Sequence, residues 1–386
     1  MEFNNVNKIL VIKLRHIGDV LLTAPVFKAL KKTFPSARTA ALVNAGTEEV
    51  LKGNAYIDEI FVFDRAIKRL PALTRYKREA DFLVQIRKNR FDMTIDLTGG
   101  DRAALLSYLS GARYRAGWKS KKGFIGKKHL YTHLSVPDGS KHIVLQNMDA
   151  VRPFGVEAED LSIDFYIPDE DRIHIRKILG PEDQKEQKNG GIVHVHPTSR
   201  WLFKCWDDRS MAEIIRWFLD RGMRVAVTSS PMKHEIEKTR GILSLVGLSQ
   251  GLVDLCGATT IKQLAALSEV ADLFFGVDSA PMHIAASVGT PVVALFGPSG
   301  AFNWGPWDNI EGNKLKGDPA GSPYPGRSGI RTFGIHTVIQ EGRQCIPCGS
   351  DGCNGSKASE CLEEIKPAIV KEILSERLEK WTGKLK

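Results

Sequence analysis

The chain has 386 residues, more than one hydrophobic core usually supports, so its length predicts two domains. A content of 42% hydrophobic and 26% charged residues is typical of a soluble globular protein, and no apolar run is long enough for a membrane span. The formal net charge of +9 favours acidic partners: nucleic acid, an anionic membrane surface or a phosphorylated substrate. The first residues lack the features of a signal peptide, so we expect a cytoplasmic location.

Basic residues gather in two stretches, 65–90 and 119–129. A solvated surface is the simpler explanation for either stretch alone, and no nucleic-acid-binding signature accompanies them. The charge is therefore compatible with several acidic partners and selects none of them.

The first half of the chain alternates apolar strands and amphipathic helices. Because the strands are apolar throughout and are joined by helices, they predict a parallel sheet covered on both faces. Strands are predicted at 8–14, 38–43, 59–63 and 91–97, and helices at 19–32, 74–89 and 100–109.

The same pattern restarts after the polar, charged segment 180–190, which we predict to be an interdomain linker or an exposed loop. Two consecutive α/β units predict two Rossmann-like domains that face one another across a cleft. No G-x-G-x-x-G motif is present, which speaks against a dinucleotide dehydrogenase. Strands are predicted at 191–195, 223–227, 252–253, 273–275 and 290–297, helices at 208–221, from 233, at 261–270 and at 366–381, and a loop-rich region at 300–355.

The first motif, KLRHIGDVLLTAP at 13–25, follows the first predicted strand. It lies at the carboxyl end of that strand, where open α/β sheets bind their ligands. Gly18 would allow a tight turn, and Asp19 would then begin the helix as a general base. Arg15 and His16 would be available to bind an anionic acceptor. The alternative is an Asp19 that only caps the helix beside two basic surface residues.

The second motif, HVHPTSR at 194–200, leaves the first strand of the second half. The hydroxyls of Thr198 and Ser199, followed by Lys204, suit a phosphate, because an ammonium offsets the charge that builds on a leaving group. The two histidines are more simply explained as satisfied residues at the edge of the core than as metal ligands, since no third ligand stands near them.

The third motif, GVDSAPMH at 276–283, lies between two apolar strands and begins a short helix. Asp278 and Ser279 stand where that helix starts, so unpaired backbone N–H groups there form a site for a phosphate or pyrophosphate. The simpler explanation is that Asp278 only caps the helix. The sequence thus has a candidate carboxylate base in one domain and a phosphate site with a lysine in the other. This combination predicts an enzyme that transfers a group from a nucleotide-activated donor without using a metal.

Four cysteines form a C-x2-C-x4-C-x7-C array near the C-terminus. In a cytoplasmic protein such an array favours a metal or iron–sulfur site over disulfides, although the spacing matches no standard zinc pattern. A loop stapled by reduced or oxidised cysteines remains the alternative. The candidate metal ligands are Cys345, Cys348, Cys353 and Cys361.

These motifs resemble those of glycosyltransferase family 9, the ADP-heptose:lipopolysaccharide heptosyltransferases, and within it members of the heptosyltransferase III type. The resemblance covers residues 8–310. The four-cysteine segment looks more like that of heptosyltransferase II-type members, so the resemblance does not fix the acceptor. The matching segments are ILVIKLRHIGD (9–19), FKCWD (203–207), GVDSAPMH (276–283), LFGPSG (295–300) and WGPW (304–307).

The resemblance implies a GT-B fold, inverting chemistry and no metal requirement. It makes Asp19 the catalytic base and Lys204 the residue that neutralises the donor pyrophosphate. Glu235 would hold the adenosine ribose, although acidity at the start of a helix explains this residue equally well. The segment with Arg15, His16 and Gly18 would bind the acceptor. The implied donor-binding residues are Thr198, Ser199, Glu235, Asp278, Ser279, Ala280, Pro281, Met282 and His283.

The resemblance also implies an organisation and a location. Residues 1–183 would form an acceptor-binding domain and residues 184–363 a donor-binding domain, with a helix at 364–386 that crosses back to the first domain. The donor would be ADP-heptose and the acceptor the lipopolysaccharide core at the inner membrane surface. The protein would be peripheral to the inner face of the cytoplasmic membrane. No cofactor would be required for catalysis, and no nucleic acid would be a partner.

Two alternatives stay open. A GT-B transferase could use another nucleotide sugar, because specificity for adenine and heptose does not follow from these residues by physical argument. A non-catalytic protein that binds a nucleotide sugar, or a metal cluster at the four cysteines, would show stoichiometric metal and no transfer activity.

Overall fold

The computed structural model describes residue 3 and residues 5–119, 123–180, 191–315 and 322–382. It contains two compact units. The first comprises Met1–Tyr166 with Gly312–Gly321, and the second comprises Ile167–Glu311 with Ser322–Lys386. None of the helices within these ranges is long and apolar enough to cross a bilayer.

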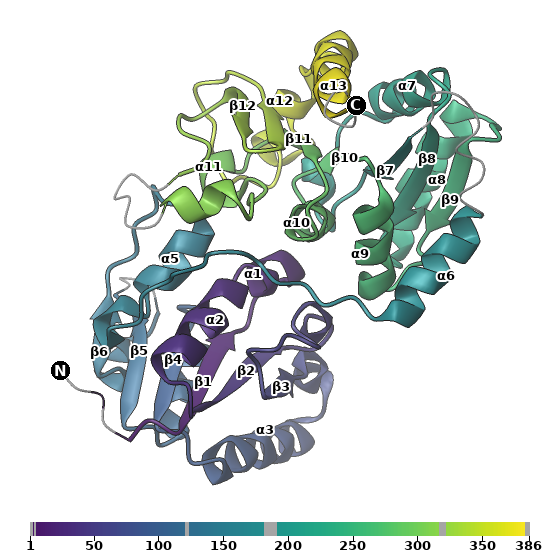
Figure 1. Cartoon of the computed structure of the whole chain (residues 1–386). Coiled ribbons are helices and arrows are strands. Elements are labelled where there is room, and N and C mark those ends of the chain that lie inside the picture. Colours follow the sequence, from purple (N-terminus) through teal and green to yellow (C-terminus); the bar gives the residue numbers. More distant parts are fainter. Residues whose placement is uncertain (1–2, 4, 120–122, 181–190, 316–321, 383–386) are drawn as a thin grey trace. The chain divides into compact units, whose positions relative to one another are not determined.

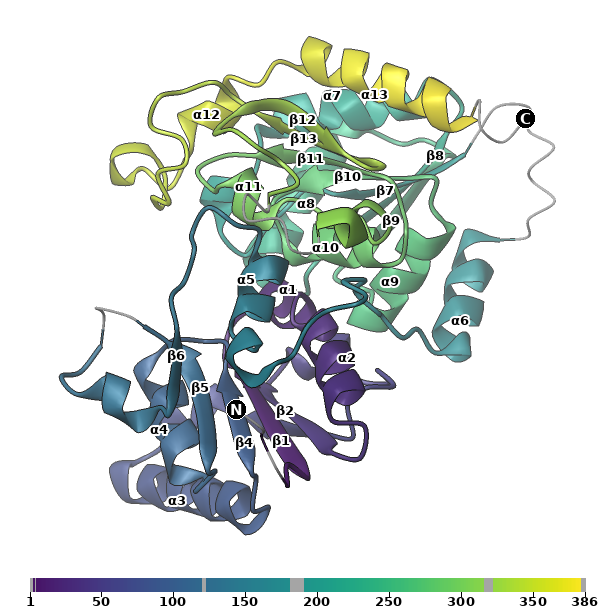
Figure 2. The same cartoon turned by 60° about the vertical axis from the view of Figure 1, so that its left-hand side comes forward.

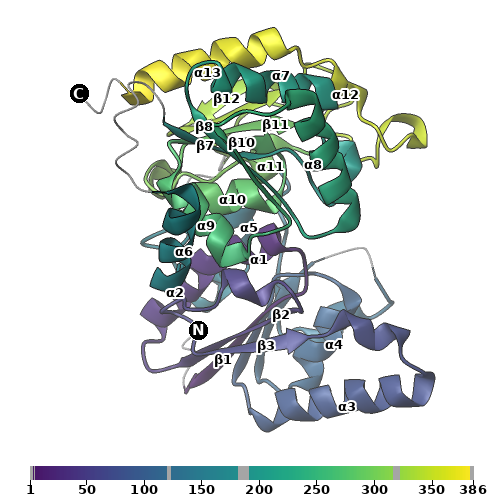
Figure 3. The same cartoon turned by 90° about the vertical axis from the view of Figure 1, so that its right-hand side faces the viewer.

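The first unit is a parallel six-stranded sheet with the order β3-β2-β1-β4-β5-β6. Helices α2 and α5 cover one face, while α3 and α4 cover the other (Figures 1 and 3). Its strands are β1 (Lys8–Lys13), β2 (Arg38–Asn44), β3 (Glu59–Phe63), β4 (Met93–Asp96), β5 (Tyr114–Trp118) and β6 (His133–Ser135). Its helices are α1 (Ile17–Leu21), α2 (Ala24–Thr33), η1 (Glu48–Val50), η2 (Arg65–Arg69), α3 (Ala72–Lys88), α4 (Asp101–Leu109), η3 (Lys127–Leu130), α5 (Ile143–Asp149) and η4 (Arg152–Phe154).

The second unit is a seven-stranded sheet with the order β12-β13-β11-β10-β7-β8-β9, parallel except for the edge strand β12 (Figure 2). Its strands are β7 (Ile192–His196), β8 (Arg224–Ser229), β9 (Leu252–Cys256), β10 (Leu273–Val277), β11 (Val292–Phe296), β12 (Gly329–Phe333) and β13 (His336–Gln340). Its helices are α6 (Asp169–Leu179), η6 (Leu202–Lys204), α7 (Asp208–Leu219), α8 (Lys233–Val246), α9 (Ile261–Val270), α10 (Ala280–Ser287), α11 (Ala301–Trp304), η7 (Glu311–Leu315, which runs into the first unit), η8 (Cys353–Gly355), α12 (Glu360–Glu363) and α13 (Pro367–Thr382).

Buried apolar residues on both faces of each sheet explain the continuous apolar strands of the sequence. In the first unit Leu10 and Ile12 pack with Ile86 of α3 in one cluster. In the second unit Val193 packs with helices α7 and α13, while Phe274 packs with α10 on the other face. A sheet covered by helices on both sides needs strands that are apolar at every position.

The helix predicted at 19–32 is two helices, α1 and α2. Pro25 explains the break, because proline has no N–H to donate and its ring clashes with the preceding turn. It is tolerated here as one of the first residues of α2, which starts afresh at Ala24.

The division into units differs from the predicted boundaries at 183 and 363. Helix α6 packs against α9 and Arg172 forms an ion pair with Glu269, so this helix belongs to the second unit. The last helix, predicted to cross back to the first domain, packs on α7, where Lys371 pairs with Glu213 at 2.7 Å. Its buried Val370 joins the core of the second unit. Of the predicted linker, residues 181–190 lie outside the described residues, as do residues 120–122 of the second basic stretch.

Candidate active site

The first motif lies where the strand order of the first sheet reverses. β1 stands between β2 and β4, so the loops that follow β1 and β4 lie side by side. The backbone N–H of Leu14 donates to Thr98 Oγ1 at 2.8 Å, and the Arg15 guanidinium donates to the Thr98 carbonyl at 3.0 Å. This carboxyl edge is the position at which open α/β sheets bind ligands.

Asp19 lies in the first turn of α1 with its side chain partly buried. The helix begins at Ile17 after an extended His16, two residues earlier than predicted. Gly18 is therefore a buried helical residue, so the expected tight turn at Gly18 is wrong, and so is the alternative in which Asp19 caps the helix. Arg15 and His16 are exposed at the same edge.

Lys13, the last residue of β1, is buried at the base of this motif, with 4% of its surface exposed. Its ammonium donates to the Leu97 carbonyl at 3.0 Å and to Asn147 Oδ1 at 3.2 Å. Burial lowers the pKa of Lys13 to about 8, although the charges of Asp19 and Asp96 act to raise it. The cation therefore lies within the electrostatic reach of the proposed base.

Asp96, at the end of β4, is a second buried charge that the sequence argument did not select. Its Oδ1 accepts from the N–H groups of Thr98 and Gly99, and its Oδ2 accepts from the Tyr131 hydroxyl at 2.6 Å. Burial raises the pKa of Asp96 despite these hydrogen bonds. The available signal in the sequence was a charged residue that ends an apolar strand, as at Lys13.

In the second unit, Lys204 and Asp278 form an ion pair of 2.6 Å between Nζ and Oδ2. η6 carries the lysine and the end of β10 carries the carboxylate, and these segments meet because β7 and β10 are adjacent. Burial acts to raise the pKa of Asp278, but the Lys204 charge and hydrogen bonds from Lys204 and Ser299 hold it below its ordinary value. Asp278 is therefore an ionised partner of Lys204, and the interpretation of it as a cap alone is wrong.

The N-terminus of α10 lies directly beside this pair. Ser279 is the residue that precedes the helix, and its buried hydroxyl has no hydrogen-bond partner within the described ranges. Met282 and His283 are buried in the first turns. Gly276 is required on the strand, because a Cβ there would stand 2.6 Å from the His196 carbonyl oxygen. A free hydroxyl beside a helix N-terminus and a lysine forms an environment for an anion.

The loop that contains Ser299 is fixed by a residue from the region predicted to be loops. Gln340, at the end of the buried strand β13, donates to the carbonyls of Gly297 and Ser299 at 2.8 and 2.7 Å. Strands β12 and β13 were not predicted. β12 shows only partial burial, and β13 is held in place by parallel pairing with the distant β11.

Glu235 is 2% exposed at the start of α8, where two hydroxyls bind it. Thr198 donates to Glu235 Oε2 at 3.0 Å and Ser230 donates to Oε1 at 2.5 Å. The predicted residues Thr198 and Glu235 are thus brought together. Ser199 is buried one residue further along, where its N–H donates to Cys205 Sγ.

The two histidines of the second motif hydrogen-bond to hydroxyls. His194 contacts Ser268 and Thr228, while His196 Nδ1 contacts Thr228, each at 2.8 Å. Burial lowers the pKa of His196 to about 3 and that of His194 well below its ordinary range. Both are neutral core residues, as the sequence analysis favoured.

The four cysteines differ in exposure: Cys345 and Cys348 are exposed, Cys353 is partly buried and Cys361 is buried. Burial raises the pKa of Cys361 to about 11, and the charges of the other three cysteines act in the same direction. The thiols therefore share one neighbourhood. Within the described ranges, however, no three histidine, cysteine or acidic side chains are grouped closely enough to hold a metal. The placed residues do not fit a metal site.

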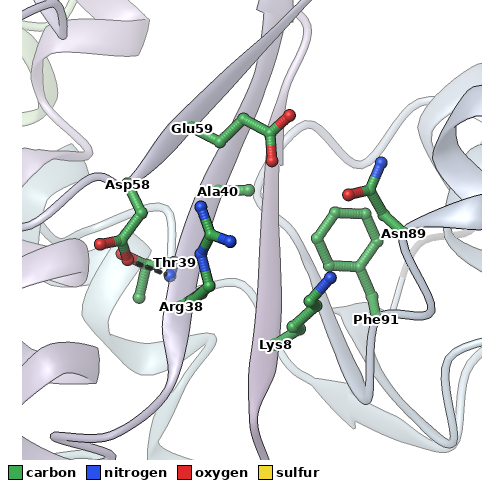
Figure 4. Close-up of a pocket in the computed structure, with 8 residues that line it drawn as sticks. All are labelled: Lys8, Arg38, Thr39, Ala40, Asp58, Glu59, Asn89 and Phe91. Carbon is green, nitrogen blue, oxygen red and sulfur yellow. Dashed lines mark hydrogen bonds between the residues drawn. The ribbon is translucent and has the colours of Figure 1, made fainter.

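Two cavities in the described part of the first unit lie away from these motifs. One is a pocket of about 10 Å³ at the amino ends of β1, β2 and β3, the edge opposite Asp19. Figure 4 shows the residues that line it, among them Thr39, whose N–H donates to Asp58. This pocket is too small for a nucleotide sugar. A larger hollow of about 420 Å³ contains none of the predicted site residues and is lined by Leu145, Met148, Arg152, Val156, Glu157, Ala158 and Leu161.

Comparison with known proteins adds the family. Residues 80–317 match the model of glycosyltransferase family 9 (heptosyltransferase). Lipopolysaccharide heptosyltransferase 3 of Escherichia coli is 31% identical over 303 residues, which cover 77% of this chain and 85% of that protein.

Two solved structures, both from E. coli, show the same fold. ADP-heptose lipopolysaccharide heptosyltransferase II gives a TM-score of 0.72 at 18% identity, with 97% of this chain and 99% of that chain covered. Heptosyltransferase WaaC with ADP gives 0.67 at 17% identity, with 96% and 99% covered. The likeness confirms the predicted α/β fold of the GT-B type.

Proposed function

Because the chain belongs to glycosyltransferase family 9, the heptosyltransferases, we propose that it transfers heptose from ADP-heptose to a hydroxyl of the lipopolysaccharide inner core. The relatives whose names contain lipopolysaccharide heptosyltransferase support this substrate class. The observation that carries the proposal is the Lys204–Asp278 pair beside the N-terminus of α10. It supplies a cation and backbone N–H groups where a diphosphate needs them.

The donor binds to the second unit in this proposal. Lys204 offsets the negative charge that develops on the departing ADP, and Ser279 donates its unused hydroxyl to a phosphate oxygen. The ion pair with Asp278 orients Lys204. The Glu235 carboxylate accepts hydrogen bonds from two hydroxyl groups. A hydroxyl of the donor ribose would replace one of these two hydrogen-bond donors. The remaining donor residues are Thr198, Ser199, Ala280, Pro281, Met282 and His283.

The acceptor binds to the first unit. The acceptor hydroxyl attacks the anomeric carbon, the bond from that carbon to the diphosphate oxygen breaks, and the hydroxyl proton passes to the Asp19 carboxylate. Attack from the side opposite the leaving group inverts the configuration. A single carboxylate suffices, unlike the pair that a hydrolase uses. Arg15 and His16, exposed at this edge, bind acidic groups of the acceptor, and the segment through Gly18 completes its binding.

The proposal includes two further features. The reaction proceeds without a metal, because Lys204 and the α10 N-terminus supply the positive charge on the leaving group. The enzyme works at the inner face of the cytoplasmic membrane as a peripheral protein, because its acceptor is anchored there.

The test is calorimetric titration of the purified chain with ADP-heptose, ADP-mannose, UDP-glucose and GDP-mannose, with and without EDTA. We expect binding of the ADP sugars that EDTA does not change. Asp19→Asn should retain donor binding and lose turnover by a factor of at least about 100, the range for a general base. Preference for a UDP or GDP sugar would refute the heptose assignment, and full activity of Asp19→Asn would refute the base.

A further inference from the structure

Most of the net charge of the chain lies in one segment of the first unit. Residues 65–90, which form η2 and α3, contain nine lysines and arginines and two acidic residues, while the whole chain has a formal charge of +9. One of the two acids, Glu79, pairs with Arg102 of α4. Across the described ranges, no ion pair neutralises Lys68, Lys77 or Lys88. The segment is therefore a concentrated positive surface.

Helix α3 has two apolar faces, and only one of them packs on the sheet. Ile86 is buried, and Phe82 and Leu83 pack against the same core cluster. A second row contains Leu73, Tyr76 and Val84, whose side chains are 84%, 60% and 51% exposed. At about 100° per residue this row lies roughly 80–160° around the helix from Ile86. Figure 3 shows α3 along the outer side of the first unit.

The neighbouring helix α4 also exposes large apolar side chains. Leu105 and Tyr108 on α4 are 44% and 48% exposed. Arg87 of α3 donates to the Leu109 carbonyl of α4 at 3.3 Å, which places the two helices side by side. We call Leu73, Tyr76 and Val84 with Leu105 and Tyr108 the α3 patch. Several exposed large apolar side chains on two adjacent helices are typical of an interaction surface.

We infer that the α3 patch is the surface by which the protein docks on an anionic lipid bilayer. An apolar row flanked by lysine and arginine on one helix has the composition of an interfacial helix, whose apolar face enters the boundary between headgroups and acyl chains. The excess of positive charge complements anionic headgroups. A protein partner with an apolar surface would leave the basic residues of 65–90 without counter-charges, so the charge distribution favours the bilayer.

The position of the patch fits the proposed function, on which this inference rests for its biological setting. η2 and the start of α3 follow the carboxyl end of β3, and β3 is parallel to β2 and β1. The segment therefore leaves the same sheet edge that carries Asp19. Docking through α3 would hold this edge close to an acceptor anchored in the bilayer.

The test is sedimentation of the full chain with vesicles of phosphatidylcholine alone or mixed with phosphatidylglycerol. We expect binding to the mixed vesicles that weakens as salt is raised. Leu73→Glu with Val84→Glu should weaken binding at least tenfold, and Lys77→Glu should weaken it roughly fivefold or more. The matched control is Ile173→Glu with Lys177→Glu on α6, which also exposes an apolar and a basic side chain but begins with three acidic residues.

Failure of this inference is distinguishable from failure of the proposed function. Vesicle binding needs no donor, and the patch variants should bind ADP-heptose like the unchanged protein because the donor residues lie in the second unit. Absence of binding to anionic vesicles, or equal loss in the α3 and α6 variants, would overturn the inference while leaving donor binding untouched. Self-association through the patch, seen as a dimer that Leu73→Glu dissociates, would also overturn it.

Discussion

Lys13 gives the sharpest prediction, because a buried ammonium makes stability depend on pH. Its pKa is lowered from the ordinary 10.5 to about 8, mainly by burial. Between these two values the unfolded chain binds a proton that the folded chain has released, so stability rises with pH across this interval. The difference corresponds to about 3 kcal/mol at 1.36 kcal/mol per pH unit. Below pH 8 both states are protonated, and the folded state bears the full cost of the buried charge.

The unchanged protein and Lys13→Met are unfolded in urea at several pH values between 7 and 10, and unfolding is monitored by circular dichroism. The free energy of unfolding of the unchanged protein should rise relative to the variant by about 2–3 kcal/mol over this range. Lys8→Met, at the other end of β1, controls for removal of a lysine from the same strand. A difference between the unchanged protein and Lys13→Met that is constant across pH would refute the reasoning.

Three further predictions concern the second unit. Lys204→Ala should weaken ADP-heptose binding at least tenfold, about 1.4 kcal/mol, as measured by calorimetry. The control Lys238→Ala should leave the affinity unchanged. If Lys204→Ala binds ADP-heptose as tightly as the unchanged protein, Lys204 does not belong to the donor site. Glu235→Gln replaces a buried carboxylate that accepts two hydroxyl hydrogen bonds, so thermal unfolding should show a loss of about 1–3 kcal/mol, and an unchanged midpoint would contradict this. Brief iodoacetamide treatment at pH 8 should label the exposed Cys345 and spare Cys361, because Cys361 is buried and its pKa is raised to about 11. Rapid labelling of Cys361 would contradict this expectation. Protection of both cysteines by added Zn²⁺ would support the metal-site hypothesis.

The parts of the fold that the sequence predicts are those determined locally. The continuous apolar strands β1 and β10 were predicted within two residues at each end, because burial on both faces leaves a run that periodicity detects. The motifs were found for the same reason: parallel strands bring their carboxyl ends to one edge, so polar residues after an apolar run mark that edge. Whether the selected residues act as proposed stays a prediction.

The missed features depend on partners distant in sequence. β13 pairs with β11, and Gln340 at its end fixes the Ser299 loop, although no local pattern indicates either contact. The C-terminal helix was assigned to the first domain by resemblance, yet Val370 is buried in the core of the second unit. Lys13 is buried against Leu97 and Asn147, which bind its ammonium and lie 84 and 134 residues further along the chain.

Each unit has a lysine and a carboxylate near the carboxyl edge of its sheet, but the two pairs differ in how their charges are compensated. In the second unit Lys204 contacts Asp278 directly at 2.6 Å, which keeps the carboxylate ionised. In the first unit the hydrogen bonds of the Lys13 ammonium to described residues go to the Leu97 carbonyl and the Asn147 amide oxygen. Asp96 accepts from two backbone N–H groups and from the Tyr131 hydroxyl. For both residues burial outweighs the hydrogen bonds and charges that oppose it, so the pKa of Lys13 is lowered and that of Asp96 is raised.

This contrast bears on the division of roles in the proposed reaction. A leaving diphosphate needs a positive charge that stays fixed throughout the turnover, which a direct ion pair provides. In the first unit the charge of Asp19, the proposed base, acts to raise the pKa of Lys13 against the larger effect of burial, so these two groups are electrostatically coupled. Asp19→Asn should therefore lower the pKa of Lys13 further and move the pH-dependent rise in stability to lower pH. The same urea series measures that shift, and an unchanged onset would show that the two groups are not coupled.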